Sequence, residues 1–342
     1  MSSLTGLGIY LAEHGWLSDR LLRSAMRRLC QKRLRHVASA DGKSGRGHET
    51  AEPTIAVETE AANEQHYELP ESFFGHILGD LRKYSCCYWG PQTTDLDDAE
   101  TDALQRTCEH AQLEDGMRVL DLGCGWGSMT RWIADQYPNC KIEAVSNSHS
   151  QREMIEQVVR ARGWQDRVQV ITADINDFCP DGQFDRIVSV EMLEHVRHHE
   201  PLFRRMSSWL HPAGKLLAHV FTHRQYSYPF ETEGADNWMG RYFFTGGIMP
   251  SENLLVETAS GFSLEEKWTW NGQHYQKTAD AWLDKMDAAR PAIDELFNSH
   301  YGDQGRVWWH RWRMFLLAVS ELFGYDDGSQ WQVNHYRFAL SP

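Results

Sequence analysis

The chain has 342 residues, and its 34 Lys and Arg against 48 Asp and Glu give a net charge of −14 at neutral pH. This acidity argues against a nucleic acid as the partner, because a phosphate backbone repels an acidic surface. The seven cysteines have no regular spacing and do not predict a disulfide framework, so we expect a reducing compartment, the cytoplasm. No signal peptide is expected, and no run of about 18 apolar residues predicts a membrane-spanning helix.

The first expected element is an amphipathic helix over residues 18–35, for which Ser18 is a suitable N-cap. Leucines form its apolar stripe, and arginines and lysines cover the opposite face. Such a basic face is typically solvated; the alternatives are docking on an acidic partner, on the acidic body of the same chain or on a membrane surface. Residues 38–53 are small, polar and Gly-rich, which predicts a linker. Residues 1–66 are therefore interpreted as a helical arm and linker.

Residues 67–342 alternate between strand and helix patterns, which predicts one α/β domain. Two helices come first, around 71–80 and 96–112, and the loop 84–89 between them is rich in aromatics and thiols, as a buried plug or an active-site lid would be. Five strands then alternate with helices and indicate a parallel, doubly wound sheet. Two further strands could add an antiparallel pair, for a total of seven. The expected strands are 117–122, 141–145, 168–172, 184–190, 215–220, 263–270 and 332–339.

Two long stretches do not fit this alternation and are expected to be cap insertions. Residues 223–258 are rich in Tyr, Trp and Phe and are too long for an ordinary loop. We expect them to cover the site and place Trp238 in the substrate pocket. Residues 276–325 are expected to be helical, and their apolar positions at helical spacing, including Phe315 and Val319, are assigned to the core rather than to a ligand wall.

The predicted domain is organised around the segment Val119–Gly127. An apolar strand contains Asp121 near its end and is followed by Gly123, Gly125 and Gly127, whose missing Cβ atoms let the backbone approach a ligand closely. A dinucleotide fold has its ribose-binding acid about 20 residues after the glycines, whereas here the acid precedes them. D-x-G-x-G-x-G is the signature of class I S-adenosylmethionine (SAM) methyltransferases, so we predict SAM as the cofactor. A purely structural glycine turn is the alternative.

Polar side chains follow the second and third expected strands, at the edge where an open α/β sheet binds its ligand. Asn147 and Gln151 replace the usual acid after the second strand, and we expect these neutral side chains to bind the ribose hydroxyls. Asp174 after the third strand is placed to accept a hydrogen bond from the adenine amino group, and its neighbour Ile175 is assigned to the same site. The alternative role for Asp174 is a helix N-cap.

Three ionisable residues, Glu191, Glu194 and His195, follow the fourth expected strand. If a helix begins here, they lie on one of its faces. Two carboxylates this close repel, which raises the pKa of one of them and suits a base that works near neutral pH. The alternative is that the acids only complement the dipole of a helix N-terminus. Nearby histidines and cysteines match no known metal-ligand spacing, so no metal is expected.

Together these motifs resemble the coclaurine N-methyltransferase-like branch of the cyclopropane-fatty-acid synthase family. The resemblance extends over nearly the whole chain and includes the loop Ser85–Tyr88, the turn Val119–Gly125 and the segment Glu321–Tyr325. It implies a class I methyltransferase fold in which the Glu/Glu/His cluster orients and deprotonates an amine. Tyr84 and Ser85 are assigned to the cofactor site.

The synthase branch also implies a bicarbonate site, whose residues match Cys86, Glu194, His219 and Tyr275 here. Tyr275 favours this branch, since the alkaloid enzymes tend to have Phe at that place. Glu191 favours the amine enzymes, because the synthases have Gly there and an alkene requires no base at that point.

The leading hypothesis is therefore SAM-dependent methylation of the amine of a small aromatic or heterocyclic molecule. The enzyme alternative is methylene or methyl transfer to an unsaturated fatty acyl chain, and a third interpretation is a non-catalytic scaffold that binds SAM or lipid. Bicarbonate binding, a homodimer and peripheral membrane contact through the basic N-terminal helix stay open.

Overall fold

The computed structural model describes residues 2–39, 54–56, 69–234 and 237–342. Most of the predicted linker 38–53 and the predicted domain boundary at residue 67 lie outside these residues. Within them, no helix is both long and apolar enough to cross a membrane.

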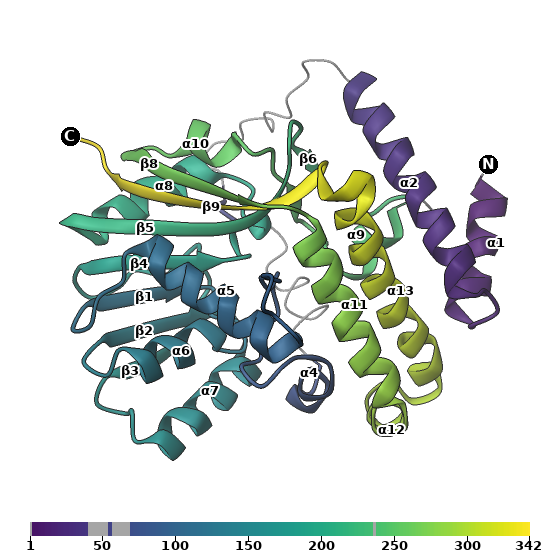
Figure 1. Ribbon diagram of the computed structural model, residues 1–342, viewed down its shortest axis with the longest axis horizontal. Coiled ribbons are helices and arrows are strands. Elements are labelled where there is room, and N and C mark those ends of the chain that lie inside the picture. The colour runs from purple at the N-terminus through teal and green to yellow at the C-terminus, as the bar shows by residue number, and fades with distance from the viewer. Residues whose placement is uncertain (1, 40–53, 57–68, 235–236) are drawn as a thin grey trace.

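A seven-stranded sheet with the strand order β3-β2-β1-β4-β5-β9-β8 forms the centre of the molecule (Figure 1). The first five strands are parallel, and β9 runs antiparallel to both β5 and β8. The predicted doubly wound α/β fold with its antiparallel last pair is confirmed. A separate two-stranded ribbon pairs β6 with β7. The strands are β1 (Arg118–Leu122), β2 (Lys141–Ser146), β3 (Val168–Thr172), β4 (Phe184–Val190), β5 (Leu210–His223), β6 (Tyr228–Pro229), β7 (Ile248–Met249), β8 (Phe262–Trp270) and β9 (Trp331–Leu340).

Helices cover both faces of the sheet because the central parallel strands are apolar on both sides. On one face, Val119 and Val188 pack with α5 (Leu96–Ala111), α6 (Ser128–Gln136) and α7 (His149–Arg162). On the other face, Leu120 and Ile187 pack with α8 (His199–Ser208) and α10 (Leu254–Thr258). The carboxyl ends of the parallel strands therefore lie at one edge of a closed three-layer core.

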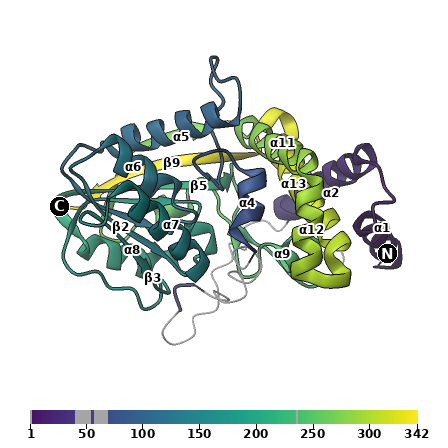
Figure 2. The same ribbon diagram turned by 90° about the horizontal axis from the view of Figure 1, so that it is seen from below.

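A third group of helices lies beside this edge rather than on a face of the sheet (Figure 2). Buried aromatics such as Trp282, Trp309 and Trp312 pack these helices together in the largest apolar cluster. Together with the cap that contains α9, they wall the carboxyl ends of the strands. The group contains α4 (Glu71–Ile77), α11 (Gln273–Ala288), α12 (Arg290–Tyr301) and α13 (Gly305–Phe323), and α9 is Trp238–Tyr242.

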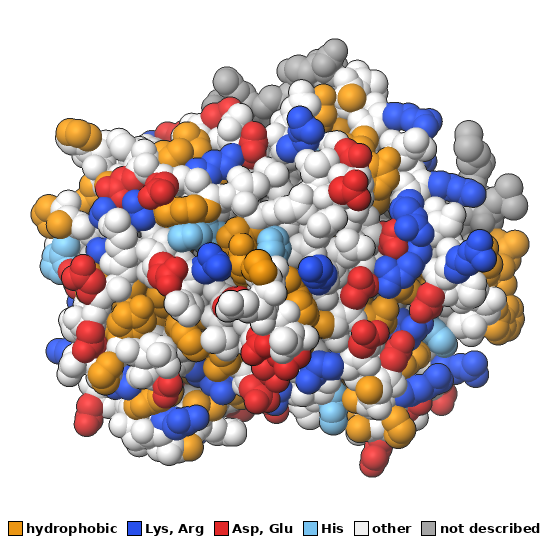
Figure 3. Space-filling model, in the orientation of Figure 1, with side chains coloured by type: hydrophobic (Ala, Val, Ile, Leu, Met, Phe, Trp, Pro, Cys, Tyr) orange, Lys and Arg blue, Asp and Glu red, His pale blue; other side chains and the backbone are white. Residues whose placement is uncertain are grey.

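The N-terminal arm consists of α1 (Ser2–Glu13) and α2 (Asp19–Ser39) and packs against α13. Its basic side chains gather over α2 with acidic side chains next to them (Figure 3). Arg23 and Arg27 pair with Glu321 at 3.0 and 3.2 Å, and Arg23 also pairs with Asp280 at 2.8 Å. These arginines therefore dock on acidic residues in the body of the same chain, which is one of the roles considered for the basic face.

Candidate functional site

The glycine turn leads from β1 into α6 with positive φ angles at Gly123, Gly125 and Gly127. A Cβ on Gly123 would lie 2.5 Å from Cγ of Met192, whereas a Cβ on Gly125 would project into open space. The turn thus keeps a cavity clear next to the sheet. Asp121 lies behind the turn, where its Oδ2 accepts a 2.6 Å hydrogen bond from Thr130, and burial raises its pKa to about 6.

The first cavity, the donor cavity, lies between this turn and the ends of β2 and β3. Six predicted cofactor residues line it, whereas Asp121 and Gly127 shape the turn from outside the lining. Asp174 holds a non-helical turn by accepting from the backbone N–H of Asn176 at 2.7 Å, so it caps no helix. The six lining residues are Gly123, Gly125, Asn147, Gln151, Asp174 and Ile175.

Gln151 shows that the donor cavity suits a nucleoside. Its Oε1 accepts a 2.5 Å hydrogen bond from Ser146, which fixes the amide orientation. Its Nε2 is buried and has no hydrogen-bond partner among the described residues. A buried unsatisfied N–H costs about 1–3 kcal/mol, and a ligand hydroxyl would remove this cost. The cradle and donor set therefore fit the ribose of SAM.

Glu191 lies directly after β4 in the left-handed region, with φ at +46°. No α-helix begins here, so the condition for placing the three ionisable residues on one helix face is not met: a 3-10 turn, η1 (Leu193–His195), follows instead. The backbone N–H of Glu191 donates to the carbonyl of His219, which continues the β4–β5 pairing past the strand end. A non-glycine residue in this conformation costs about 1–3 kcal/mol and persists where surrounding structure enforces it.

Three groups donate hydrogen bonds to the Glu191 carboxylate or lie within hydrogen-bond distance of it. The backbone N–H of Cys86 and the ring Nε2 of His219 lie 2.8 and 3.2 Å from Oε1, and the Tyr275 hydroxyl donates to Oε2 at 2.6 Å. Burial raises the pKa of Glu191, and the charge of Lys83 and these hydrogen bonds act in the opposite direction. The result is a fixed, buried carboxylate with a proton affinity above that of a free Glu.

The side chains of Glu194 and His195 point in different directions from the 3-10 turn, so the two residues have different surroundings. Glu194 lines neither cavity; its Oε1 accepts from the backbone N–H of Phe221 at 2.7 Å. Burial and the charge of Glu191 raise the pKa of Glu194 far above its usual range, as the like-charge argument predicts. Burial lowers the pKa of His195 to about 4, so its imidazole is neutral.

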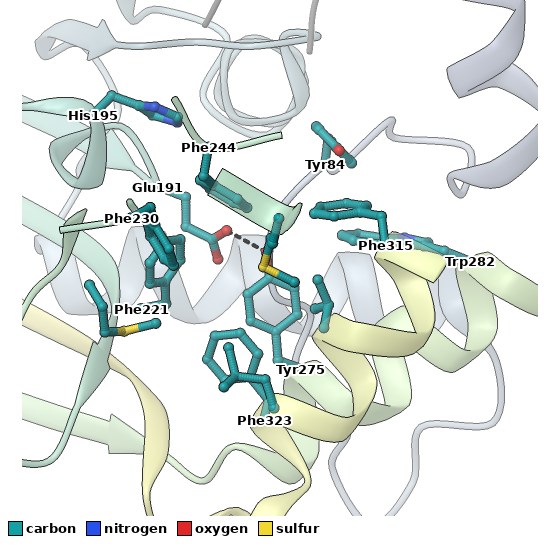
Figure 4. A pocket seen from close by; sticks show the side chains of 14 residues that line it. Tyr84, Glu191, His195, Phe221, Phe230, Phe244, Tyr275, Trp282, Phe315 and Phe323 are labelled. Carbon is teal, nitrogen blue, oxygen red and sulfur yellow. Dashed lines mark hydrogen bonds between the residues drawn. The ribbon is translucent and has the colours of Figure 1, made fainter. Parts of the chain in front are cut away.

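The second cavity, the acceptor cavity, is walled by aromatic and Met side chains around Glu191 (Figure 4). Phe315 and Val319 of α13 belong to the buried core, as predicted, and also line this cavity, because the apolar stripe of α13 is broad and one edge faces the cavity. Glu191 and His195 are the described residues that line both cavities. The other lining residues are Tyr84, Phe221, Phe230, Met239, Phe244, Met249, Tyr275, Trp282, Leu322 and Phe323.

Trp238 lines neither cavity, and its placement in the substrate pocket is wrong. Its indole N–H donates to Glu13 of α1 at 3.0 Å, and its ring packs on Tyr242 and Phe243. Successive side chains of a helix are rotated by about 100° around the helix axis. The next residue of α9, Met239, therefore faces the acceptor cavity, while Trp238 contacts the N-terminal arm.

The loop 84–89 is a buried plug whose residues have separate roles. Tyr84 lines the acceptor cavity instead of the donor cavity, and Ser85 lines neither. Ser85 and the carbonyl of Cys86 accept hydrogen bonds from Nζ of the buried Lys83. The sequence analysis missed Lys83, although a lysine directly before an aromatic, thiol-rich loop is a signal for a buried charge near the site. No group of histidines, cysteines or acids that could hold a metal occurs in the described ranges.

The strand order, the glycine turn and the nucleoside-shaped cavity define a class I SAM-dependent methyltransferase. Residues 56–333 match the family model for mycolic acid cyclopropane synthetase. The (S)-coclaurine N-methyltransferase of Thalictrum flavum subsp. glaucum is 36% identical over 296 residues, which cover 85% of this chain and 82% of the relative. The chain therefore belongs to the mycolic acid cyclopropane synthetase family.

Two further relatives show the range of this family. The crystal structure of a coclaurine N-methyltransferase bound to N-methylheliamine and SAH has a TM-score of 0.89 and 32% sequence identity, and the match covers 97% of this chain and 98% of that chain. The cyclopropane-fatty-acyl-phospholipid synthase of Escherichia coli (strain K12) is 30% identical over 271 residues, which cover 79% of this chain and 66% of the synthase. Because the relatives include both amine and lipid enzymes, family membership alone does not identify the acceptor.

Proposed function

We propose that the protein transfers the methyl group of SAM to the nitrogen of a compact aromatic or heterocyclic amine. The observation that carries the proposal is the position of Glu191, which lines both cavities where they meet. The named N-methyltransferases among the relatives, at up to 36% identity, support the same acceptor chemistry. When bound, SAM supplies a methyl group that is already activated by its positively charged sulfur.

The base in this proposal is Glu191, because an amine must lose its proton before its nitrogen can attack. The carboxylate takes a proton from the bound ammonium, and the N–H bonding electrons stay on nitrogen as the attacking lone pair. The Cys86 N–H and the Tyr275 hydroxyl hold the carboxylate in one orientation. The neutral imidazole of His195 at the same junction can accept a hydrogen bond from the amine and direct its lone pair.

The aromatic wall supports a cationic acceptor. Phe230, Phe244 and Phe315 surround the space next to the carboxylate (Figure 4). Aromatic faces attract an ammonium group by about 0.5–2 kcal/mol each and exclude water at the same time. A flat ring of the acceptor can pack on the same faces while its nitrogen approaches Glu191. Aromatic amines with a long polar substituent are expected to fit poorly.

The lipid alternative is less well supported, because the residues predicted to bind bicarbonate already contact other groups of the protein. The Cys86 backbone, His219 and Tyr275 all contact the Glu191 carboxylate, and the fourth group, Glu194, is held by Phe221. A side-chain carboxylate thus occupies the place that a bound bicarbonate would need. An enzyme with this arrangement requires no added anion.

The test is incubation of the full chain with isotopically labelled SAM and two acceptor sets, a panel of cyclic secondary and tertiary amines and vesicles of unsaturated phospholipid. Labelled N-methyl products without any need for bicarbonate are the expected result. Label that enters only the lipid, with turnover that depends on bicarbonate, would reject the amine proposal. Products are identified by a mass increase of one methyl group.

We also propose that the protein works in a reducing compartment such as the cytoplasm, since all seven cysteines are free. The arm presents exposed apolar side chains, among them Leu7, Tyr10 and Trp16, next to basic residues of α2. Peripheral contact with an anionic membrane or a second copy of the chain would cover them. Flotation with anionic vesicles and light scattering of the free protein distinguish the two partners.

A further inference from the structure

Three histidines form a row from the catalytic carboxylate toward the protein surface. His219 on β5 lies 3.2 Å from Glu191, and His335 on β9 is its cross-strand partner, with ring centroids 4.5 Å apart. Nδ1 of His335 then lies 2.8 Å from Nδ1 of His110, the half-buried histidine near the end of α5. In Figure 1, β4, β5 and β9 lie side by side and α5 lies in front of the sheet, where it contacts β5 and β9.

The buried ring nitrogens in this row call for an explanation. Nδ1 of His219 and Nε2 of His335 are both buried and have no hydrogen-bond partner among the described residues. Burying a polar nitrogen without a partner lowers stability, and apolar residues at these central strand positions would avoid this cost. The two orphan nitrogens belong to adjacent rings whose centroids are 4.5 Å apart, so proton transfer between these rings would complete the row.

We propose that His219, His335 and His110 relay the proton of the acceptor amine from Glu191 to solvent. This inference rests on the proposed function, in which Glu191 becomes protonated inside a site that the acceptor closes. The proton passes to Nε2 of His219, which releases one from Nδ1; His335 takes it at Nε2 and releases one from Nδ1. His110 takes that proton at Nδ1 and releases one from Nε2 to water. One proton enters and one leaves, and no other bond changes.

The surroundings keep each ring neutral, as a relay requires. Burial lowers the pKa of His110 to about 4 and the pKa values of His219 and His335 well below their usual range. The positive charge of Lys83 also lowers the pKa values of His219 and His335. At His110, Arg106 and Arg337 lower the pKa, and Glu109 and Glu266 raise it. A neutral imidazole carries one N–H and one lone pair, so it can accept and donate at once without retaining the proton.

His110 and His335 are thus positioning residues that act through His219 and Glu191, and packing holds them in place. The His110 ring stacks on Trp268 at 3.8 Å and 3°, and Nη1 of Arg337 donates to its carbonyl at 3.0 Å. Phe at position 110 would keep this stack and remove both nitrogens. The matched control is His310, also half-buried with a pKa lowered to about 4, but located on α13 against the arm.

The decisive experiment measures kcat, KM and the solvent isotope effect for H110F, H335Q and the control H310F. We expect kcat to fall about 10-fold or more in the first two, with unchanged KM for SAM and amine and a larger solvent isotope effect. Added imidazole should restore H110A, because the vacated space over Trp268 fits the ring. Unchanged kcat and isotope effect in both relay variants would overturn the proposal while amine methylation stands.

A second measurement needs no turnover and separates this proposal from the proposed function. In protein with ¹⁵N-labelled histidine, the ring nitrogen shifts of His335 and His110 should change in E191Q, since the row transmits the altered hydrogen bond. The corresponding shifts of His310 should stay constant. If His335 and His110 do not respond, the relay is wrong even for an active enzyme. If wild type methylates no amine yet both respond, the proposed function fails and the coupling of the row stands.

Discussion

At the scale of single residues, Glu191 combines backbone strain with a buried charge. Its φ of +46° lies in the left-handed region, which favours glycine. Three groups of the surrounding protein contact its carboxylate all the same. A residue that costs stability in two ways and is held this firmly is best explained by its chemistry.

The strain can be measured by comparing E191G with E191A. Both variants lose the carboxylate and leave the same donors unpaired, but only glycine adopts this φ without strain. We expect E191G to be more stable than E191A by about 1 kcal/mol in urea unfolding. Equal stabilities would show that the backbone relaxes in the variants and that the position is not strained.

The roles of the two acids can be separated by conservative variants. E191Q should lower kcat by about 10² to 10⁴-fold because it removes the base. E194Q should have a much smaller effect, because Glu194 lines neither cavity and burial and the charge of Glu191 raise its pKa. Since burial raises the pKa of Glu191 and only the carboxylate is active, kcat/KM of wild type should fall as the pH decreases, with a midpoint above the ordinary value of 4.5. A larger loss of kcat in E194Q than in E191Q would mean that Glu194, and not Glu191, is the base.

At the scale of elements, the arm and the cap shape the acceptor cavity together through α13. One face of α13 carries Phe315 and Val319 to the cavity, and the other side contacts α2, where Arg23 pairs with Glu321. Trp238 joins the cap to α1 by its hydrogen bond to Glu13. The arm therefore supports the cavity wall without contributing a residue to it.

The seam between arm and body depends on Glu321, which is only 6% exposed. R23A leaves this carboxylate with Arg27 alone, so we expect a loss of about 1–2 kcal/mol in the free energy of unfolding. R20A on the same helix is the control, because Arg20 is exposed and should change stability by less than about 0.5 kcal/mol. Urea denaturation measures both. Equal effects of the two substitutions would mean that general charge, and not the buried pair, stabilises the seam.

At the scale of the whole molecule, histidines with a lowered pKa outnumber acids with a raised pKa. We expect the histidines to dominate the way in which the free energy of unfolding changes with pH. Histidines with a lowered pKa bind fewer protons in the folded state than in the unfolded state, so their contribution to stability is lost as the pH falls from about 6.5 toward 4. Acids with a raised pKa have the opposite effect; these are Glu100 and Asp121, raised to about 7 and about 6, together with Glu191 and Glu194. The histidines whose pKa is lowered to about 4 are His110, His195, His199, His223, His274 and His310.

We therefore expect the protein to be less stable at about pH 5 than at about pH 7. Thermal unfolding in buffers of equal ionic strength gives the two Tm values. A Tm that is equal or higher at the lower pH would mean that the buried acids dominate. Repeating the comparison with H199Q, which removes a buried histidine that lines neither cavity, should reduce the difference between the Tm values at the two pH values.

The sheet, the glycine turn and the SAM-binding edge could all be predicted from the amino-acid sequence. These features depend on local patterns: strands that are apolar on both faces, and glycines placed where a backbone turn needs positive φ. The residues after β2 and β3 could be named for the same reason, since parallel strands of one sheet bring their carboxyl ends together.

Which side chains meet across the site could not be predicted from the sequence, because it depends on the packing of distant segments. No α-helix forms at residue 191, because Glu191 continues the pairing to His219 and its carboxylate accepts hydrogen bonds from Cys86 and Tyr275. Trp238, Phe315 and Lys83 received their roles from packing between segments far apart in the chain. Long-range packing selects one face of a helix or one direction of a loop, and no local pattern of residue types records that selection.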